Sequence, residues 1–136
     1  MATFNKIFSN RNLQAMRLKG FILLTLFSLM ACTKEKDKFL PTVAIVSITD
    51  ITSSSAKIIT KVTDEGGGTV TGTGACWGTA INPNFSNNVS NVGAGIGEFI
   101  SIPNNLNSNT TYNVRAFATN EVGTSYSTNK SFTTLN

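Results

Sequence analysis

Short runs of β-branched and aromatic residues, separated by glycine, asparagine, aspartate and serine, extend from Pro41 to the end of the chain. The clearest run is Thr110–Thr119, in which apolar side chains occupy every second position beginning with Tyr112 and Val114. A period of two places alternate side chains on opposite faces of a β-strand. Because no run keeps the period of an amphipathic helix, the pattern favours an all-β fold.

Other runs with the same character predict further strands, each bounded by turn residues. They cover residues 42–48, 56–62, 70–78, 98–102 and 124–133, with a poorly patterned edge strand at 85–92. About six or seven short strands at this spacing indicate a single antiparallel β-sandwich. Residues 42–134 are enough for one such domain and too few for two.

A charge-free run, Phe21–Met30, follows Arg17 and Lys19 near the amino terminus. A helix of about ten residues spans roughly 15 Å, about half of the roughly 30 Å of a bilayer's hydrocarbon core. The run is therefore too short to cross a membrane comfortably, and it fits the apolar region of a secretory signal peptide. A buried core helix is the alternative.

The tetrad Leu29-Met30-Ala31-Cys32 ends this run and resembles the lipobox of bacterial lipoproteins. The resemblance implies cleavage between Ala31 and Cys32, a thioether-linked diacylglycerol on Cys32 and acylation of the new amino terminus. Several acyl chains on one residue would hold the protein firmly in a membrane, because each buried methylene contributes about 0.8 kcal/mol. A structural thiol at Cys32 is the alternative.

The chain is therefore expected to comprise a signal peptide at 1–31, a lipidated cysteine with a charged, solvated tether at 32–40, and a β-sandwich at 41–136, with Met16 as an alternative start. Thr33 stands where bacterial lipoproteins retained in the inner membrane carry an aspartate. The resemblance thus implies a lipid-anchored envelope protein, in the outer rather than the inner membrane. The charged residues that follow resemble either surface-export signals or an ordinary hydrophilic spacer.

The formal net charge of +4 is concentrated in the segment that is expected to be removed. Lys6, Arg11, Arg17 and Lys19 precede Cys32, which leaves 7 of the 11 basic residues (11 − 4) against 7 acidic ones. The mature chain is thus close to neutral. No basic patch is expected, and no nucleic-acid partner.

The sequence lacks the residue set that acid–base or nucleophilic catalysis needs. It contains no histidine, and beyond the signal peptide Arg115 is the single arginine. Cys76, beside Trp77, has no histidine to activate it, so a lone buried thiol is expected. Asp64 and Glu65 lie in a glycine-rich stretch, which predicts a solvated turn. A calcium site at these two carboxylates is the alternative. We therefore expect neither an enzyme nor a cofactor nor a metal.

The segment Leu106–Ala116, followed by Ala118-Thr119-Asn120 and Gly123-Thr124-Ser125, resembles the last third of a fibronectin type III domain. In that family a leucine lies six residues before the tyrosine of the tyrosine corner, as Leu106 does before Tyr112. The resemblance implies that the Tyr112 hydroxyl bonds to the backbone near Leu106 and fixes the corner.

A second group of residues resembles the fibronectin type III variant that is repeated in many bacterial surface and secreted proteins. It consists of Gly74-Ala75-Cys76-Trp77, Asn82-Pro83, Gly97 and Phe99. One feature departs from the family, in which the core tryptophan usually lies on the second strand. Trp77 lies on the third expected strand, so the resemblance is to a divergent bacterial branch or to a neighbouring immunoglobulin-like superfamily.

Phe117 and Arg115 are expected to point away from Tyr112 and Val114, onto the outer face of the sandwich. An aromatic side chain there is explained by ordinary partial exposure, or by a neighbouring loop that covers it. The third explanation is a contact surface for a sugar or a partner protein, which Tyr126 on the last expected strand would share.

These observations predict a non-catalytic, membrane-anchored lipoprotein whose fibronectin type III-like module binds or scaffolds at the cell envelope. They leave the protein or glycan ligand unidentified. A structural spacer, or a truncated remnant of a larger multidomain surface protein, is the alternative function. An envelope hydrolase is a third reading, which would need two carboxylates facing each other across a cleft.

Overall fold

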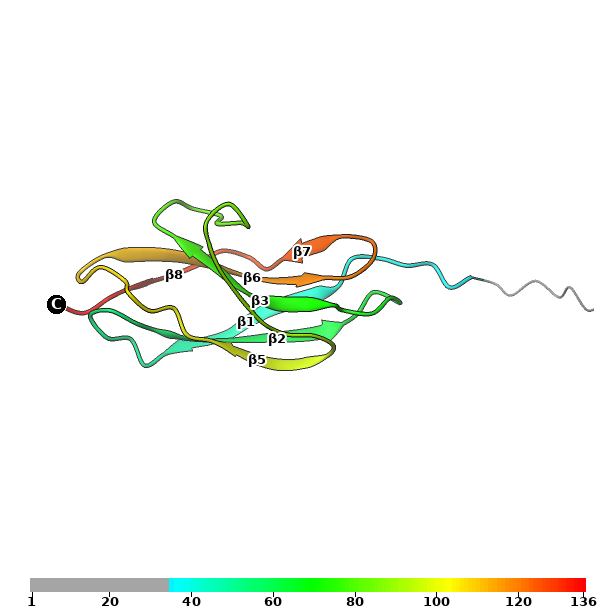
Figure 1. The fold of residues 1–136 in the computed structure, drawn as a ribbon, viewed down its shortest axis with the longest axis horizontal. Helices are drawn as coiled ribbons and strands as arrows, with labels where there is room; N and C mark the ends of the chain where they lie inside the picture. The colour runs from blue at the N-terminus through cyan, green and yellow to red at the C-terminus, as the bar shows by residue number, and fades with distance from the viewer. Residues whose placement is uncertain (1–34) are drawn as a thin grey trace, which may run out of the picture. The chain divides into compact units, whose positions relative to one another are not determined.

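Eight antiparallel strands form two sheets in the computed structural model, which describes residues 35–136 (Figure 1). The three-stranded sheet has the order β1 (Thr42–Thr49), β2 (Lys57–Asp64), β5 (Gly97–Ser101). The five-stranded sheet has the order β4 (Asn88–Gly93), β3 (Gly72–Gly78), β6 (Thr111–Thr119), β7 (Thr124–Tyr126), and β8 (Lys130–Thr133) also pairs with β6. This architecture confirms the predicted all-β sandwich.

The expected signal peptide, with Ala31 at its end, and the expected lipidated residue Cys32 lie outside the described residues. Among residues 35–136, no helix is long and apolar enough to span a bilayer.

Strand β2 shows why the alternating pattern produces a sandwich. Its Ile58 and Val62 side chains are fully buried, whereas Lys57 is partly exposed and Lys61 is exposed. The apolar positions therefore face the second sheet and the lysines face solvent, as the period of two predicts.

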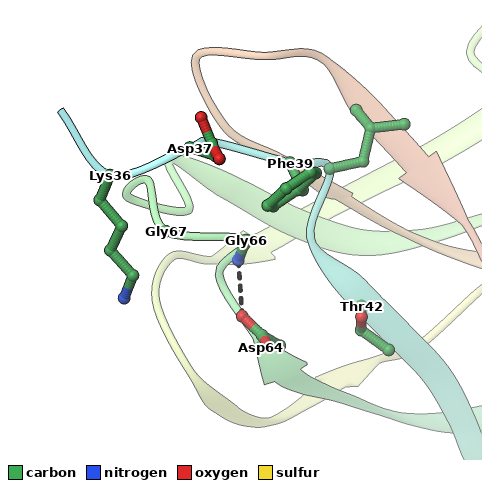
Figure 2. Close-up of a pocket in the computed structure, with 8 residues that line it drawn as sticks. Lys36, Asp37, Phe39, Thr42, Asp64, Gly66 and Gly67 are labelled. Atoms are coloured by element: carbon green, nitrogen blue, oxygen red, sulfur yellow. Dashed lines mark hydrogen bonds between the residues drawn. The ribbon is translucent and has the colours of Figure 1, made fainter. Parts of the chain in front are cut away.

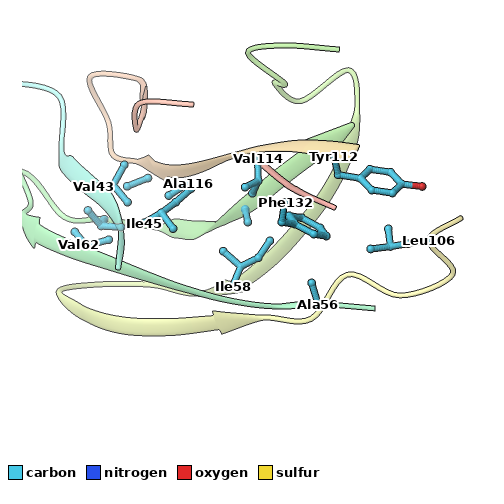
Figure 3. Packing of buried hydrophobic residues seen from close by; sticks show 13 residues of the cluster. Val43, Ile45, Ala56, Ile58, Val62, Leu106, Tyr112, Val114, Ala116 and Phe132 are labelled. Carbon is cyan, nitrogen blue, oxygen red and sulfur yellow. The ribbon is translucent and has the colours of Figure 1, made fainter. Parts of the chain in front are cut away.

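The core lies between the two sheets, and Leu106 from the β5–β6 connection closes one end of it (Figure 3). Trp77 and Phe99 pack against this core from β3 and β5. The buried cluster consists of Val43, Ile45, Ala56, Ile58, Val62, Val70, Ala75, Leu106, Tyr112, Val114, Ala116, Ala118 and Phe132. Burying apolar area of this kind is the main term that favours folding.

Most strands begin or end within two residues of the expected position, and two expected strands differ more. The last expected strand, 124–133, is divided into β7 and β8 because the Ser127 hydroxyl accepts a hydrogen bond from the Ala116 amide at 3.0 Å, in place of a backbone carbonyl. The expected edge strand 85–92 is replaced by β4, which starts at Asn88 after a turn in which Asn84 Oδ1 accepts the Ser86 amide. In both places an asparagine or serine side chain competes with the backbone ladder.

Candidate functional site

Arg115, Phe117 and Tyr126, the three residues predicted to form a contact surface, lie together on the outer face of the five-stranded sheet. A fourth residue, Phe85 from the β3–β4 connection, joins them. The Phe85 ring meets Phe117 edge-on at a centroid distance of 4.7 Å and meets Tyr126 at 5.8 Å. The Arg115 guanidinium carbon lies 4.7 Å from the centre of the Tyr126 ring. We call these four residues the aromatic cluster.

Strand register and one glycine position the aromatic cluster. Phe117 is paired with Tyr126 on one side and with Gly74 on the other. A Cβ atom at Gly74 would collide with the carbonyl oxygen of Ser90 and would lie 3.2 Å from the Phe117 ring. Only glycine at this position lets the ring lie against β3 while β4 stays paired.

Phe117 is 2% exposed and is therefore part of a small second core, not of an accessible surface. Partial exposure, cover by a loop and a contact surface were the three alternatives for this side chain. In the structure, the β3–β4 loop covers Phe117 with the side chain of Phe85. Phe85 itself is 48% exposed, and Tyr126 is partly exposed. The accessible aromatic is thus a loop residue that the strand pattern missed, because nothing in the sequence of a turn indicates which sheet face it will cover.

The Arg115 side chain is held by the sheet that it covers. Its Nε donates a hydrogen bond to the Ser127 carbonyl at 2.9 Å, and its charge lies over the Tyr126 ring. Cation–π contacts of this kind contribute about 0.5–2 kcal/mol. The guanidinium is thus oriented by its neighbours within the domain.

Cys76, paired with Arg115 across β3 and β6, is a free and fully buried thiol. Burial raises the pKa of the Cys76 thiol to about 11, and the charge of Arg115 opposes this rise only in part. The Cys76 thiol donates to the Arg115 carbonyl at 3.6 Å. Since the thiolate is the nucleophilic form, this thiol stays protonated and unreactive at neutral pH.

Tyr112 and Leu106 lie at the end of the domain that contains the carboxyl terminus. The Tyr112 hydroxyl accepts a hydrogen bond from the Asn107 amide at 3.0 Å, one residue beyond Leu106. The Tyr112 ring stacks on Phe132 at a centroid distance of 5.8 Å. This geometry ties the connection between the two sheets to β6.

A second constellation, which the sequence reading assigned to a solvated tether, lies at the opposite end of the domain. Residues 36–40, which we call the strap, run against the β2–β3 turn. The Phe39 amide donates to the Gly66 carbonyl at 2.7 Å, and Asn120 Nδ2 donates to the Phe39 carbonyl at 2.7 Å and to the Glu65 carbonyl at 2.9 Å. Gly66 has a φ of 71°, and a Cβ there would collide with the Phe39 carbonyl, so the contact requires glycine.

An ion pair links the strap to the β6–β7 turn. Lys38 Nζ lies 2.7 Å from Glu121 Oε1, and Glu121 Oε2 accepts the Thr69 amide at 3.1 Å. The hydrogen bond from Lys38, together with backbone amides that include that of Thr69, lowers the pKa of Glu121 to about 2. The strap is therefore attached to both the β2–β3 turn and the β6–β7 turn.

Between the strap and the β2–β3 turn lies a hollow of about 260 Å³ (Figure 2). This volume is below the roughly 300–1,000 Å³ of typical small-molecule sites. Asp64 and Glu65 at this turn accept the backbone amides of Gly66 and Val70, at 2.7 and 3.1 Å. Within residues 35–136, no group of three or more histidine, cysteine, aspartate or glutamate side chains is placed to hold a metal ion. The residues that line the hollow are Lys36, Asp37, Phe39, Leu40, Thr42, Asp64, Gly66 and Gly67.

Neither a protein-family model nor a curated protein matches this sequence. Solved structures with a similar fold do exist. The fourth fibronectin type III domain of a human protein is 21% identical with a TM-score of 0.55, and the alignment covers 78% of this chain and 86% of that domain. The sensor domain of the anti-sigma factor RsgI4 of Pseudobacteroides cellulosolvens is 22% identical with a TM-score of 0.50, covering 71% and 96%.

Domains A168–A170 of titin are 20% identical with a TM-score of 0.50, over 73% of this chain and 32% of that one. At these identities the likeness concerns the fold alone. Together with the two antiparallel sheets, it identifies the described part of the chain as a β-sandwich of the fibronectin type III-like fold.

Proposed function

We propose that this protein is a lipid-anchored, non-catalytic module that binds or scaffolds at the cell envelope through its fibronectin type III-like domain. The observation that carries the anchor is the position of Cys32, which follows Leu29-Met30-Ala31 at the end of a charge-free run. A fold of this class commonly serves as a binding or structural module, and function then depends on the surface that the domain presents.

The reactive side chains of the domain support the non-catalytic part of the proposal. Cys76 is buried with a raised pKa, and Arg115 is stacked on Tyr126. Asp64 and Glu65 accept backbone amides of their own turn. These groups stabilise the domain, and proton transfer would need them oriented toward a substrate instead.

Replacement of the lipobox cysteine tests the anchor. In a bacterial host, the Cys32→Ser chain should lose palmitate labelling and leave the membrane fraction. The matched control is Cys76→Ala, which removes the other cysteine and should keep both properties. Palmitate labelling that persists in Cys32→Ser would refute the proposed anchor.

The accessible part of the aromatic cluster is the place to test for a partner. A photo-crosslinking amino acid at Phe85 should give a discrete adduct in envelopes of the native host, whereas the same group at exposed Asn104, in the β5–β6 connection, should not. Equal labelling at the two positions would argue against a binding role for the cluster.

A structural spacer is the second candidate, and the placement of the two ends of the described chain favours it. The strap contacts the β2–β3 turn, whereas Leu135 donates to the Thr52 carbonyl at 2.9 Å at the opposite end (Figure 1). A domain entered at one end and left at the other can hold two partners apart. A native-host protein with a mass one domain larger than residues 32–136 would favour the spacer.

A further inference from the structure

The strap shortens the free chain between the proposed anchor and the domain. Lys38 and Phe39 are bonded to the β2–β3 and β6–β7 turns, so only residues 33–37 stand between Cys32 and the first bonded residue, Lys38. The step from Cys32 to Lys38 is six Cα–Cα intervals, or roughly 20 Å when fully extended. The end of the domain that carries the strap must therefore lie close to any membrane that holds Cys32.

That end of the domain, which we call the amino-terminal pole, consists of the strap and of the turns at 64–69, 94–96 and 120–123. Three turns meet there because Gly95 donates to the Val70 carbonyl at 2.9 Å and Asn120 bonds to the strap. Large apolar side chains project from it into solvent. Phe39 is 65% exposed, Ile96 is 62% exposed, and Val122 is 48% exposed.

Exposing the apolar side chains of Phe39, Ile96 and Val122 to water is unfavourable, by about 25 cal/mol per Å² of apolar surface. The same side chains are favourable at the boundary between lipid headgroups and acyl chains, where amphipathic segments bury their apolar faces roughly 5–10 Å deep. The charges of the pole do not favour anionic lipids. Its described residues carry two lysines and four carboxylates, a net charge of −2 (2 − 4).

We propose that the amino-terminal pole rests on the bilayer surface, with Phe39, Ile96 and Val122 in contact with lipid, so that the domain stands end-on with its carboxyl-terminal end away from the membrane. This inference depends on the proposed lipid anchor at Cys32. The strap fixes the orientation, because a domain on a free tether could turn any face toward the membrane.

Site-directed fluorescence in the intact lipoprotein tests the orientation. Single cysteines are introduced at Val122 on the pole, at Ile100 on the outer face of the three-stranded sheet and at Leu135 at the opposite end. All three native side chains are exposed, whereas Cys76 is buried and stays unlabelled. Each bimane-labelled protein is reconstituted into phosphatidylcholine vesicles that contain lipid with a nitroxide headgroup.

Quenching by the nitroxide lipid should be several-fold stronger at Val122→Cys than at Leu135→Cys or Ile100→Cys, and it should not increase when a fraction of anionic phosphatidylglycerol is added. Strong quenching at Ile100→Cys would mean that the domain lies on its sheet face, and equal quenching at all three positions would mean that it has no fixed orientation. Either result overturns the inference.

The strap has its own test in the same vesicles. Glu121→Gln removes the ion pair with Lys38, and the contrast in quenching between Val122→Cys and Leu135→Cys should fall. Glu98→Gln, which removes the Lys61–Glu98 pair at 3.4 Å on the three-stranded sheet, is the matched control and should leave the contrast unchanged. If the difference in quenching between these two positions stayed the same in Glu121→Gln, the strap would not be what fixes the orientation of the domain.

Membrane fractionation separates the two proposals. A protein that does not enter the membrane fraction refutes the anchor. A protein that enters this fraction and shows no preference for quenching at Val122 refutes the end-on orientation alone.

Discussion

The hydroxyl oxygen of Tyr112 accepts a hydrogen bond from the backbone amide of Asn107 at 3.0 Å. Tyr112 lies in the strand β6, and Asn107 lies in the connection that crosses from the three-stranded sheet to the five-stranded sheet. The bond thus fixes a connection that has no strand partner of its own. Fibronectin type III-like sandwiches use such a tyrosine to fix a corner between strands.

Tyr112→Phe should lower the free energy of unfolding by about 1–2 kcal/mol, because it removes the acceptor and leaves the Asn107 amide without its partner. The ring and its stacking on Phe132 are retained, so the change isolates the hydroxyl. Urea unfolding followed by Trp77 fluorescence measures the effect. An unchanged urea midpoint would show that the bond contributes nothing to stability.

Phe117→Ala should lower the free energy of unfolding by about 3–5 kcal/mol, the usual cost of removing a buried phenylalanine. Phe85→Ala should cost only about 1–2 kcal/mol, because this half-exposed ring loses mainly its two edge contacts. Urea unfolding of both variants gives the comparison. If Phe85→Ala were the more damaging change, the assignment of Phe117 as the covered residue would be wrong. Binding assays should therefore use Phe85 variants, since Phe117→Ala would confound binding with stability.

Asn120 bonds to the strap, to the β2–β3 turn and within its own β6–β7 turn, so its replacement should destabilise all three segments. Its Oδ1 accepts the amides of Val122 and Gly123 at 2.9 and 3.2 Å, while Nδ2 donates to Phe39 and Glu65. Asn120→Ala should therefore lower the free energy of unfolding by about 2–3 kcal/mol. Limited trypsin digestion should also cleave the variant after Lys38 faster than the parent protein. Asn104→Ala, an exposed asparagine at the opposite end, is the control that should change neither quantity.

The ion pair between Lys38 and Glu121 should make the stability of the strap depend on pH. The pKa of Glu121 falls from 4.5 to about 2 in the folded protein, so its contribution is fully present above pH 4.5 and is lost as the pH falls toward 2. The difference in urea midpoint between the parent protein and Glu121→Gln should shrink over this window. A difference that stayed constant down to pH 2 would contradict the lowered pKa.

Cys76 should react with thiol reagents only when the domain unfolds. In a Cys32→Ser chain it is the single cysteine, since the sequence contains two. At pH 8 Ellman's reagent should label it at the rate of global opening, because the thiol is buried and its pKa is about 11. An added exposed thiol, Val122→Cys, should react fast in the same conditions and serves as the control. Rapid labelling of Cys76 in native buffer would contradict its burial.

The strands could be predicted because burial imposes a period of two on the sequence. Ile58, Thr60 and Val62 follow this period, and all three are fully buried. The division of the last strand could not be predicted in the same way. It depends on the Ser127 hydroxyl taking the place of a backbone acceptor, and a serine within a strand pattern carries no sign that it will do so.

The candidate site was only partly predictable for a related reason. Arg115, Phe117 and Tyr126 share one face because of strand register, which the sequence pattern contains. Phe85 reaches that face through a turn whose path depends on asparagine side chains, so no local rule relates it to Phe117. The strap was missed because Lys38 and Phe39 bond to residues more than 20 positions away, and the local composition resembles a solvated linker.

The strap also determines where a pull on the amino-terminal side of the chain enters the domain. Asn120 and Glu121, which hold the strap, directly follow β6, a strand that pairs with β3, β7 and β8. A force applied from that side is therefore shared with β6, inside the larger sheet, before it reaches β1. Strand β1 lies at a sheet edge, where its hydrogen bonds would otherwise break one at a time. The mechanical resistance of the domain then depends on a turn that lies far along the chain from the point of pulling.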